Sequence, residues 1–240
     1  MTKKTWCLAA TLCALASAAH AADLLTQWNF NSAMPDANTS TGTLQPSVGA
    51  GVATLVGGIG GSFASGTVNG GSTDPAPADD SGWQTTAYAA QGTEDRARGV
   101  QFSVSTLGFR DIVVSWDQRH SNTPSRFVQF QYSLDGLQFT DHGGLLVGDA
   151  GDTWFNQRSV DLSMLAGVAD NASFAFRIVA AFAPSSTGYQ ASSSTASYSP
   201  NGTWRFDMVS VQASPIPEPG SWALLIAGLS AVGFVARRRN

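Results

Sequence analysis

The chain has 240 residues, of which 43% are hydrophobic and only 12% are charged, whereas about 25% is usual for a soluble domain. This apolar content argues against wholesale disorder, and 25 glycines and 10 prolines argue against both collagen and a helical bundle. No lysine lies between residues 5 and 236. From Asp23 to Asp207, eight arginines face sixteen acidic residues, a net charge of −8. Such a body repels polyphosphate, so the composition argues against nucleic-acid binding.

The first 21 residues have the three parts of a secretory signal peptide. Two lysines at 3–4 form a basic region, residues 6–18 form an apolar core, and Ala-His-Ala at 19–21 forms a small-residue cleavage site. We therefore expect a signal helix over 1–21 that signal peptidase removes. Both cysteines of the chain lie inside this segment, so the mature protein is expected to lack disulfides, thiol nucleophiles and thiolate metal sites.

The last residues, 215–240, form a second targeting segment. Pro217-Glu218-Pro219 lies in an extended stretch, because each proline removes a donor and disfavours helix before it. Residues 222–236 carry no charge and precede Arg237-Arg238-Arg239. This run predicts a short transmembrane helix, since a full span needs about 20 residues. The arginines should stay on the cytoplasmic side.

This order of tripeptide, apolar run and basic end resembles the PEP-CTERM sorting signal, a tail also classed as the C-terminal domain of ice-binding proteins. The resemblance covers residues 215–240. It implies that the tail holds the exported protein in the inner membrane of a Gram-negative bacterium until an exosortase-type protease removes the tail. The body would then pass to the cell surface or the exopolysaccharide matrix. An ordinary C-terminal anchor is the alternative.

Residues 22–214, between the two targeting segments, show the period-two alternation of half-buried strands. Helical periodicity is confined to one short candidate helix at 162–168. Strands of this number with glycine-rich turns predict a mainly β fold, an antiparallel, jelly-roll-like β-sandwich. The expected strands are 25–31, 51–56, 84–89, 99–105, 112–117, 127–133, 155–162, 174–179 and 203–211.

Turns and loops of this body are also marked. Asp135-Gly136 between two apolar-rich runs predicts a tight hairpin turn. Residues 57–82 and 184–202 show no periodicity, and loops of such length are usually functional or disordered. We expect disorder for the first and a packed loop, pinned by its tyrosines, for the second.

Residues 116–119, 131–136 and 202–207 resemble jelly-roll modules of secreted bacterial proteins. The surroundings of Asp207 resemble the last strand of calcium-bearing jelly rolls, which implies a structural calcium with Asn31 or Asn29 as a further ligand. The other interpretation, which we favour from the residues, is an ion pair between Asp207 and an arginine of the sheet such as Arg205.

Catalytic motifs are weak in this sequence. Outside the signal segment the histidines are His120 and His142, and no G-x-S-x-G nucleophile motif occurs. Sixteen acidic residues make some carboxylate pair inevitable, so no pair stands out for glycoside hydrolysis. We therefore predict no catalytic residue.

Sugar binding uses aromatic platforms with planar polar groups in a shallow cleft. Trp116 and Trp204 alternate into apolar faces and are expected in the core, whereas Trp83 and Trp154 follow loops and are expected on the surface. We expect polar side chains to line one sheet face, namely Asp117, Arg119, Gln129, Gln131 and Arg177.

These observations predict an exported, non-enzymatic cell-surface or matrix protein that associates with polysaccharide. Two alternatives stay open. One is a surface glycan-active hydrolase or lyase. The other is an ice-binding protein, which would need a regular threonine-rich array that the sequence does not contain.

Overall fold

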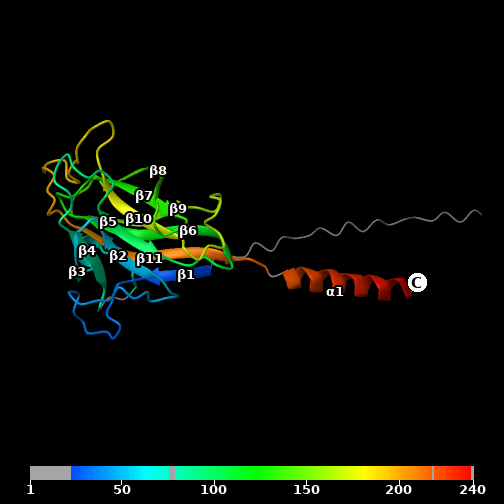
Figure 1. Ribbon diagram of the computed structural model, residues 1–240. Coiled ribbons are helices and arrows are strands. Elements are labelled where there is room, and N and C mark those ends of the chain that lie inside the picture. The colour runs from blue at the N-terminus through cyan, green and yellow to red at the C-terminus, as the bar shows by residue number, and fades with distance from the viewer. Residues whose placement is uncertain (1–22, 76–78, 218, 239–240) are drawn as a thin grey trace, which may run out of the picture.

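The computed structural model describes residues 23–75, 79–217 and 219–238 (Figure 1), without the side chains of 219–225 and 231. The expected signal peptide and its cleavage site lie outside the described residues. So do Glu218 and Arg239 of the sorting motif.

Two antiparallel sheets form a β-sandwich (Figure 1), which confirms the predicted fold class. Sheet A has the order β3-β4-β11-β6-β9, and β1 also pairs with β11. Its strands are β1 (Asp23–Trp28), β3 (Gly60–Ser65), β4 (Ser81–Thr86), β6 (Phe109–His120), β9 (Thr153–Asp161) and β11 (Trp204–Pro215). Sheet B has the order β2-β5-β10-β7-β8. Its strands are β2 (Val52–Val56), β5 (Gly99–Ser103), β7 (Phe127–Ser133), β8 (Thr140–Val147) and β10 (Ala175–Ala181).

An aromatic column crosses the core between the sheets. Phe102, Phe176 and Phe130 stack along sheet B, with ring centroids 5.1 and 5.6 Å apart, and Trp116 of sheet A stacks on Phe130 at 5.9 Å. All four side chains are buried, as is Trp204, so both tryptophans expected in the core are there. Burying each such side chain contributes roughly 1.5–3 kcal/mol to folding.

Two strands, β3 and β8, lie where the sequence pattern predicts none. β3 falls inside residues 57–82, so the expectation of disorder is wrong for the described part of that segment. It begins with Gly60-Gly61 and pairs with β4 along its whole length. β8 contains Gly143-Gly144. Both strands lie at sheet edges, where few buried side chains are needed and the alternation is therefore weak.

Two local predictions are wrong in detail. Residues 162–168 form successive turns instead of a helix, with the N–H of Leu165 bonded to the carbonyl of Leu162. The β7–β8 connection spans 134–139, longer than a two-residue hairpin turn. Asp135 Oδ1 organises it by accepting the N–H groups of Leu137 and Gln138, both at 2.8 Å.

The loop 184–202 is packed and pinned by tyrosines, as predicted. Tyr189 and Tyr198 stack with ring centroids 4.6 Å apart. The Tyr189 hydroxyl donates to the backbone carbonyls of Thr93 and Glu94, and the Tyr198 hydroxyl donates to that of Ala89 at 2.7 Å.

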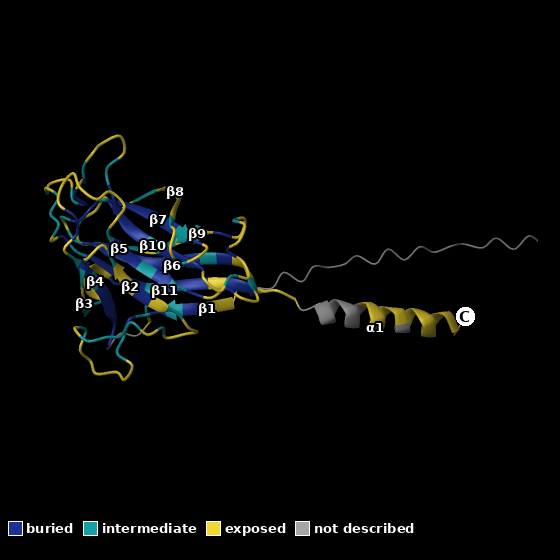
Figure 2. Cartoon of the chain, in the orientation of Figure 1, coloured by how far each residue is buried: buried dark blue, intermediate teal, exposed yellow. Residues whose placement is uncertain are grey.

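The tail forms a helix, α1 (Pro219–Arg238), that lies apart from the sandwich (Figure 1). Apolar side chains such as Ile226 and Phe234 are exposed on it (Figure 2). The predicted helix is therefore present, but its predicted transmembrane character is not confirmed: among the described residues, no helix is both long and apolar enough to cross a membrane. Glycine and serine at positions 228, 230 and 233 dilute its apolar run.

Candidate functional site

Two buried carboxylates lie opposite each other on neighbouring strands of sheet A. Asp117 of β6 and Asp207 of β11 are partners in the strand register and point away from the core, because Trp116 and Phe206 beside them point inward. The strand register shifts, as at a β-bulge, beside each carboxylate: after Asp207 in the β11–β6 pairing and at Asp117 in the β6–β9 pairing. Met208, next to Asp207, has a φ of 47°. Such bulges redirect side chains next to functional sites.

The covering loop, residues 66–75, lies over this outer face of sheet A. Asp117 Oδ2 accepts the N–H and the hydroxyl of Thr73 at 2.6 and 2.7 Å, and Asp117 Oδ1 accepts the N–H of Gln157. Trp154 Nε1 donates to the carbonyl of Val68 at 2.8 Å. Asp117 is therefore fully hydrogen-bonded and holds the loop in place.

Beneath the loop, three carboxylates form what we call the acidic centre: Asp74, Asp80 and Asp207. One oxygen from each lies within 4.8 Å of the others. Asp74 comes from the covering loop, and Asp80 immediately precedes β4. Gly66 permits this approach, since a Cβ there would lie 1.8 Å from Asp80 Oδ1.

Two oxygens of the acidic centre are buried without compensation. Asp207 is fully buried and Asp80 is 2% exposed, yet Asp207 Oδ2 and Asp80 Oδ1 have no hydrogen bond of normal geometry within the described residues. Arg205 makes no ion pair with Asp207 there. It donates instead to Gln84 Oε1 and to the carbonyl of Ser65. The favoured interpretation of Asp207 as an ion-pair partner is therefore wrong.

Burial dominates the electrostatics of the centre. It raises the pKa of Asp207 well above its ordinary value, and the Asp80 carboxylate adds to this shift. Burial, reinforced by the charge of Asp74, raises the pKa of Asp80 to about 6. Burial also lowers the pKa of Arg205 to about 10. Arg205 lowers the pKa of Asp80 and the Ser72 side chain lowers that of Asp207, but burial outweighs both. Without a further cation, the centre must hold protons near neutral pH or bear repelling charges.

The donor set fits a hard divalent cation. Calcium takes carboxylate, carbonyl and amide oxygens, and the acidic centre offers three carboxylates, of which Asp80 and Asp207 each have a buried oxygen without a hydrogen bond of normal geometry. Asn31 lies beside it: its Nδ2 donates to Asp74 Oδ2 at 2.8 Å, and its Oδ1 accepts the N–H of Ser81. Asn31 and Asp207 are thus brought to one region, with Asn31 orienting Asp74.

Asp74 and Asp80 were not among the predicted ligands. The only sequence signal for them was the Asp79-Asp80 pair within a stretch expected to be disordered. Their relation to Asp207 depends on long-range pairing of β4 with β11, which no local pattern encodes.

The tryptophans expected on the surface are buried. Trp83 is 2% exposed and packs against Phe30 and Phe102, with centroids 5.6 and 6.1 Å away. Trp154 is 8% exposed, because the covering loop lies over it. The prediction that both are exposed is wrong, since β4 places Trp83 in the core and the covering loop, distant in sequence, lies over Trp154.

The expected single polar face is divided between the two sheets. Asp117 and Arg119 lie on the outer face of sheet A, where Arg119 Nη2 donates to Asp152 Oδ1 at 2.6 Å. Gln129, Gln131 and Arg177 belong to sheet B. The prediction of one shared face is therefore wrong, because β6 and β7 lie in different sheets.

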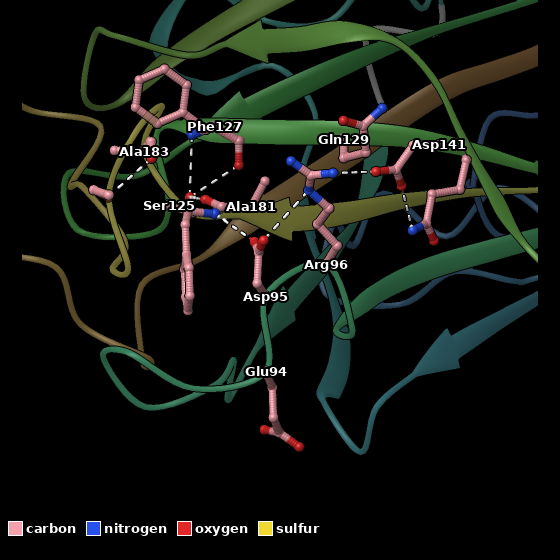
Figure 3. A network of polar contacts seen from close by, with 12 residues as sticks. Glu94, Asp95, Arg96, Ser125, Phe127, Gln129, Asp141, Ala181 and Ala183 are labelled. Carbon is pink, nitrogen blue, oxygen red and sulfur yellow. Dashed lines mark hydrogen bonds and ion pairs between the residues drawn. The ribbon is translucent and has the colours of Figure 1, made fainter.

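Sheet B carries a polar row of its own, Gln101, Arg177, Gln131 and Asp141, in register across β5, β10, β7 and β8. Arg177 Nε donates to Gln101 Oε1 at 2.9 Å, and Gln131 Nε2 donates to Asp141 Oδ1 at 2.8 Å. Figure 3 shows Arg96, from the loop before β5, lying between Asp95 and Asp141. The row is shallow and runs across four strands.

The two histidines of the body differ in burial. His120 is fully buried, its Nδ1 lies 2.9 Å from the hydroxyl of the equally buried Ser192, and burial holds its pKa well below the ordinary value. His142 is half-buried with its ring 5.9 Å from that of Tyr132. The nucleophile–base pair formed by Ser192 and His120 is thus closed to solvent.

Comparison with protein families identifies the tail. The model described as the PEP-CTERM protein-sorting motif matches residues 215–239. The chain is therefore a β-sandwich protein that carries a PEP-CTERM sorting motif, and the motif implies export and membrane-anchored sorting. No curated protein matches the chain.

Several solved structures are similar at low identity. The tandem CBM22 domains of Xyn10C from Paenibacillus barcinonensis are 14% identical over 85% of this chain, with a TM-score of 0.47. This chain spans about half of that structure, 48%. The K1 cleaved adhesin domain of Lys-gingipain from Porphyromonas gingivalis W83 is 12% identical, with 80% and 98% of the two chains covered and a TM-score of 0.36. The sandwich assignment itself rests on the two sheets.

The raised pKa of Asp80 predicts a pH-dependent effect of removing its charge. In metal-free protein, Asp80→Asn should have a larger free energy of unfolding than the unchanged chain at pH 7, and this advantage should shrink towards pH 4. The folded pKa of about 6 exceeds the ordinary 3.8, so the contribution of protonated Asp80 is present below 3.8 and lost as pH rises through 6.

Urea unfolding in chelator at pH 4, 5, 6 and 7 measures this difference. The loss of neutral His120 at low pH affects both proteins alike and cancels. A difference that stays constant across this range would contradict the assignment.

Proposed function

We propose that the chain is an exported, non-enzymatic cell-surface or matrix protein whose β-sandwich associates with polysaccharide. The observation that carries the association is the polar row of sheet B. Its planar side chains are those of Gln101 and Arg177, which are half-buried, and of Gln131, which is 8% exposed. They lie side by side in register, with the Phe139 ring against Arg177. Shallow surfaces of planar donors and acceptors beside an aromatic ring suit sugar hydroxyls.

The non-enzymatic part of the proposal is supported by the chemistry of the described residues. His120 and Ser192 are fully buried, and Asp80 and Asp207 of the acidic centre are buried beneath the covering loop. A glycan-active hydrolase or lyase, the alternative from another class, needs an acid or base that substrate can reach.

The sorting motif in the tail supports the proposed export and processing of the protein. After signal peptidase acts, the sorting motif would keep the protein at the inner membrane until an exosortase-type protease cuts beside Pro217, releasing the body to the surface. β11 ends at Pro215, and the N–H of Ile216 still bonds to the carbonyl of Gly108 at 2.8 Å. The cut would therefore fall just outside the sheet and leave β11 whole.

A second function is favoured by the acidic centre. We propose that it holds one structural calcium ion, with Asp74, Asp80 and Asp207 as ligands and Asn31 orienting Asp74. The uncompensated buried oxygens of Asp80 and Asp207 support this, because a cation would replace the protons that the buried carboxylates otherwise require.

Polysaccharide binding predicts a defined loss on truncating the row. Gln101→Ala and Gln131→Ala should each weaken retention by a bound polysaccharide about two- to tenfold, as expected for losing one or two hydrogen bonds. Affinity gel electrophoresis against a panel of bacterial exopolysaccharides measures the retention. Gln212→Ala, an exposed glutamine on sheet A, is the matched control. Shortening of any polysaccharide by the protein would instead support the enzyme alternative.

Sorting predicts the mass of the mature product. In cells that contain the processing protease, the product should lack residues 1–21 and a segment that begins near 217, and it should reach the surface. Without the protease it should keep the tail and stay with the membrane fraction. Intact-mass spectrometry of each fraction checks both. A full-length cytoplasmic product, or unchanged surface display after deletion of 215–240, would refute the proposal.

Calcium binding predicts ligand-linked stability. Calcium at about a hundred times its Kd should add about 2.7 kcal/mol to the free energy of unfolding, because the unfolded chain does not hold the site together. Asp207→Asn should abolish most of this gain. Asp111→Asn, which removes a half-exposed carboxylate on β6, should retain it. Calorimetric titration with calcium and unfolding curves with and without chelator test the site, and an equal gain in both variants would rule it out.

A further inference from the structure

Arg177 lies at the centre of the polar row, held in a fixed orientation. Its Nε donates to Gln101 Oε1 at 2.9 Å, and its guanidinium carbon lies 3.5 Å from the centroid of the Phe139 ring. Stacking and hydrogen bonding together restrain the plane of the guanidinium, which is half-buried. The group is thus ordered before any ligand arrives.

This cation has no carboxylate partner. Within the described residues, no acidic oxygen lies within 4.0 Å of Arg177, whereas Arg96, Arg98 and Arg119 each pair with one. Asp141, in the same row, already pairs with Arg96 and accepts from Gln131. Desolvating a guanidinium without an anion is costly, so its surroundings are suited to receive one.

The hydrogen-bonding edge of Arg177 is available. Its two Nη groups make no hydrogen bond within the described part of the chain, and together they form a fork that matches a carboxylate. Gln131, its partner in register on β7, uses Nε2 for Asp141 and leaves Oε1 as an acceptor. A carboxylate and a neighbouring hydroxyl would therefore be met by Arg177 and Gln131.

The negative charge of the body does not oppose such a ligand at this face. Much of the excess lies on the side of sheet A, where Asp74, Asp80 and Asp207 form the acidic centre and Asp117 lies opposite Asp207. Charges separated by more than about 8 Å are largely screened at physiological ionic strength. The polar row itself has paired charges plus the uncompensated Arg177.

We infer that the polar row binds an acidic polysaccharide, with Arg177 receiving a uronate carboxylate and Gln131 a sugar hydroxyl. This inference rests on the proposed function, because it names the class of polysaccharide that the same face would take. It distinguishes a carboxylated sugar polymer from a neutral one.

Polygalacturonate and its fully methyl-esterified form make a matched pair of probes, since the ester removes the charge and keeps the sugar backbone. The purified full chain should bind the acid at least about tenfold more tightly than the ester, the effect of one charge-assisted bidentate contact. Arg177→Gln should erase this preference, and Arg177→Lys, which keeps the charge without the fork, should retain part of it. Arg110→Gln, on the exposed part of β6, should change nothing.

Calorimetric titration of all four proteins with both polymers, together with their thermal unfolding midpoints, decides the matter. Loss of preference in Arg177→Gln with an unchanged midpoint supports the inference. Equal affinity of the unchanged chain for acid and ester, or a preference that survives in Arg177→Gln, overturns it while leaving polysaccharide association standing. If the chain binds neither polymer nor any member of the exopolysaccharide panel, the proposed function fails as well.

Discussion

Aromatic packing between the two sheets is the constraint on which the rest of the molecule depends. Both cysteines lie in the first 21 residues, so no disulfide is available to the body once the predicted signal is removed. The two sheets are instead held together by the aromatic column of Phe102, Phe176, Phe130 and Trp116. It packs rings from β5, β10 and β7 of sheet B and from β6 of sheet A against one another. Because both inner faces are committed to this core, charged side chains of the central strands such as Asp117, Asp207 and Arg177 point outward. The two outer faces then acquire opposite characters.

On the outer face of sheet A, acidic side chains lie close together. The position of β11 in the sheet explains this clustering. Its inward residues, Trp204 and Phe206, fix the register with β6, which forces Asp207 to lie opposite Asp117. Asp117 satisfies itself by binding the covering loop, and the loop in turn buries Asp207. The same hydrogen bonds that order the loop thus create an uncompensated carboxylate beneath it. A cation there would relieve a cost that the fold itself imposes.

The strands with clear alternation and the core positions of Trp116 and Trp204 were predictable, since the alternation depends on residues close together in sequence. The tyrosines of 184–202 indicated a packed loop, although the residues that hold them, 89–94, lie far away in the sequence. The edge strands β3 and β8 were not predictable, because glycine and exposed polar residues remove the periodic signal there. The predicted exposure of Trp83 and Trp154 was wrong for a different reason. A preceding loop indicates exposure only when no other part of the chain packs over the side chain. Predicting the acidic centre would require knowing that β4 pairs with β11. Of its three residues, only Asp207 was a candidate metal ligand from the sequence.

β11 also connects the site to the tail. It carries Asp207 near its start, pairs with β1, β4 and β6, and ends at Pro215, directly before the sorting motif. Force or proteolysis applied at the tail therefore acts on a strand flanked by pairing partners on both sides, not on an edge. Detaching that strand would require breaking its pairing with three strands and exposing both Trp204 and Phe206. The sandwich should therefore stay folded when the tail is pulled or cut. A cation bound between β11, the start of β4 and the covering loop would tighten the same strand at its other end.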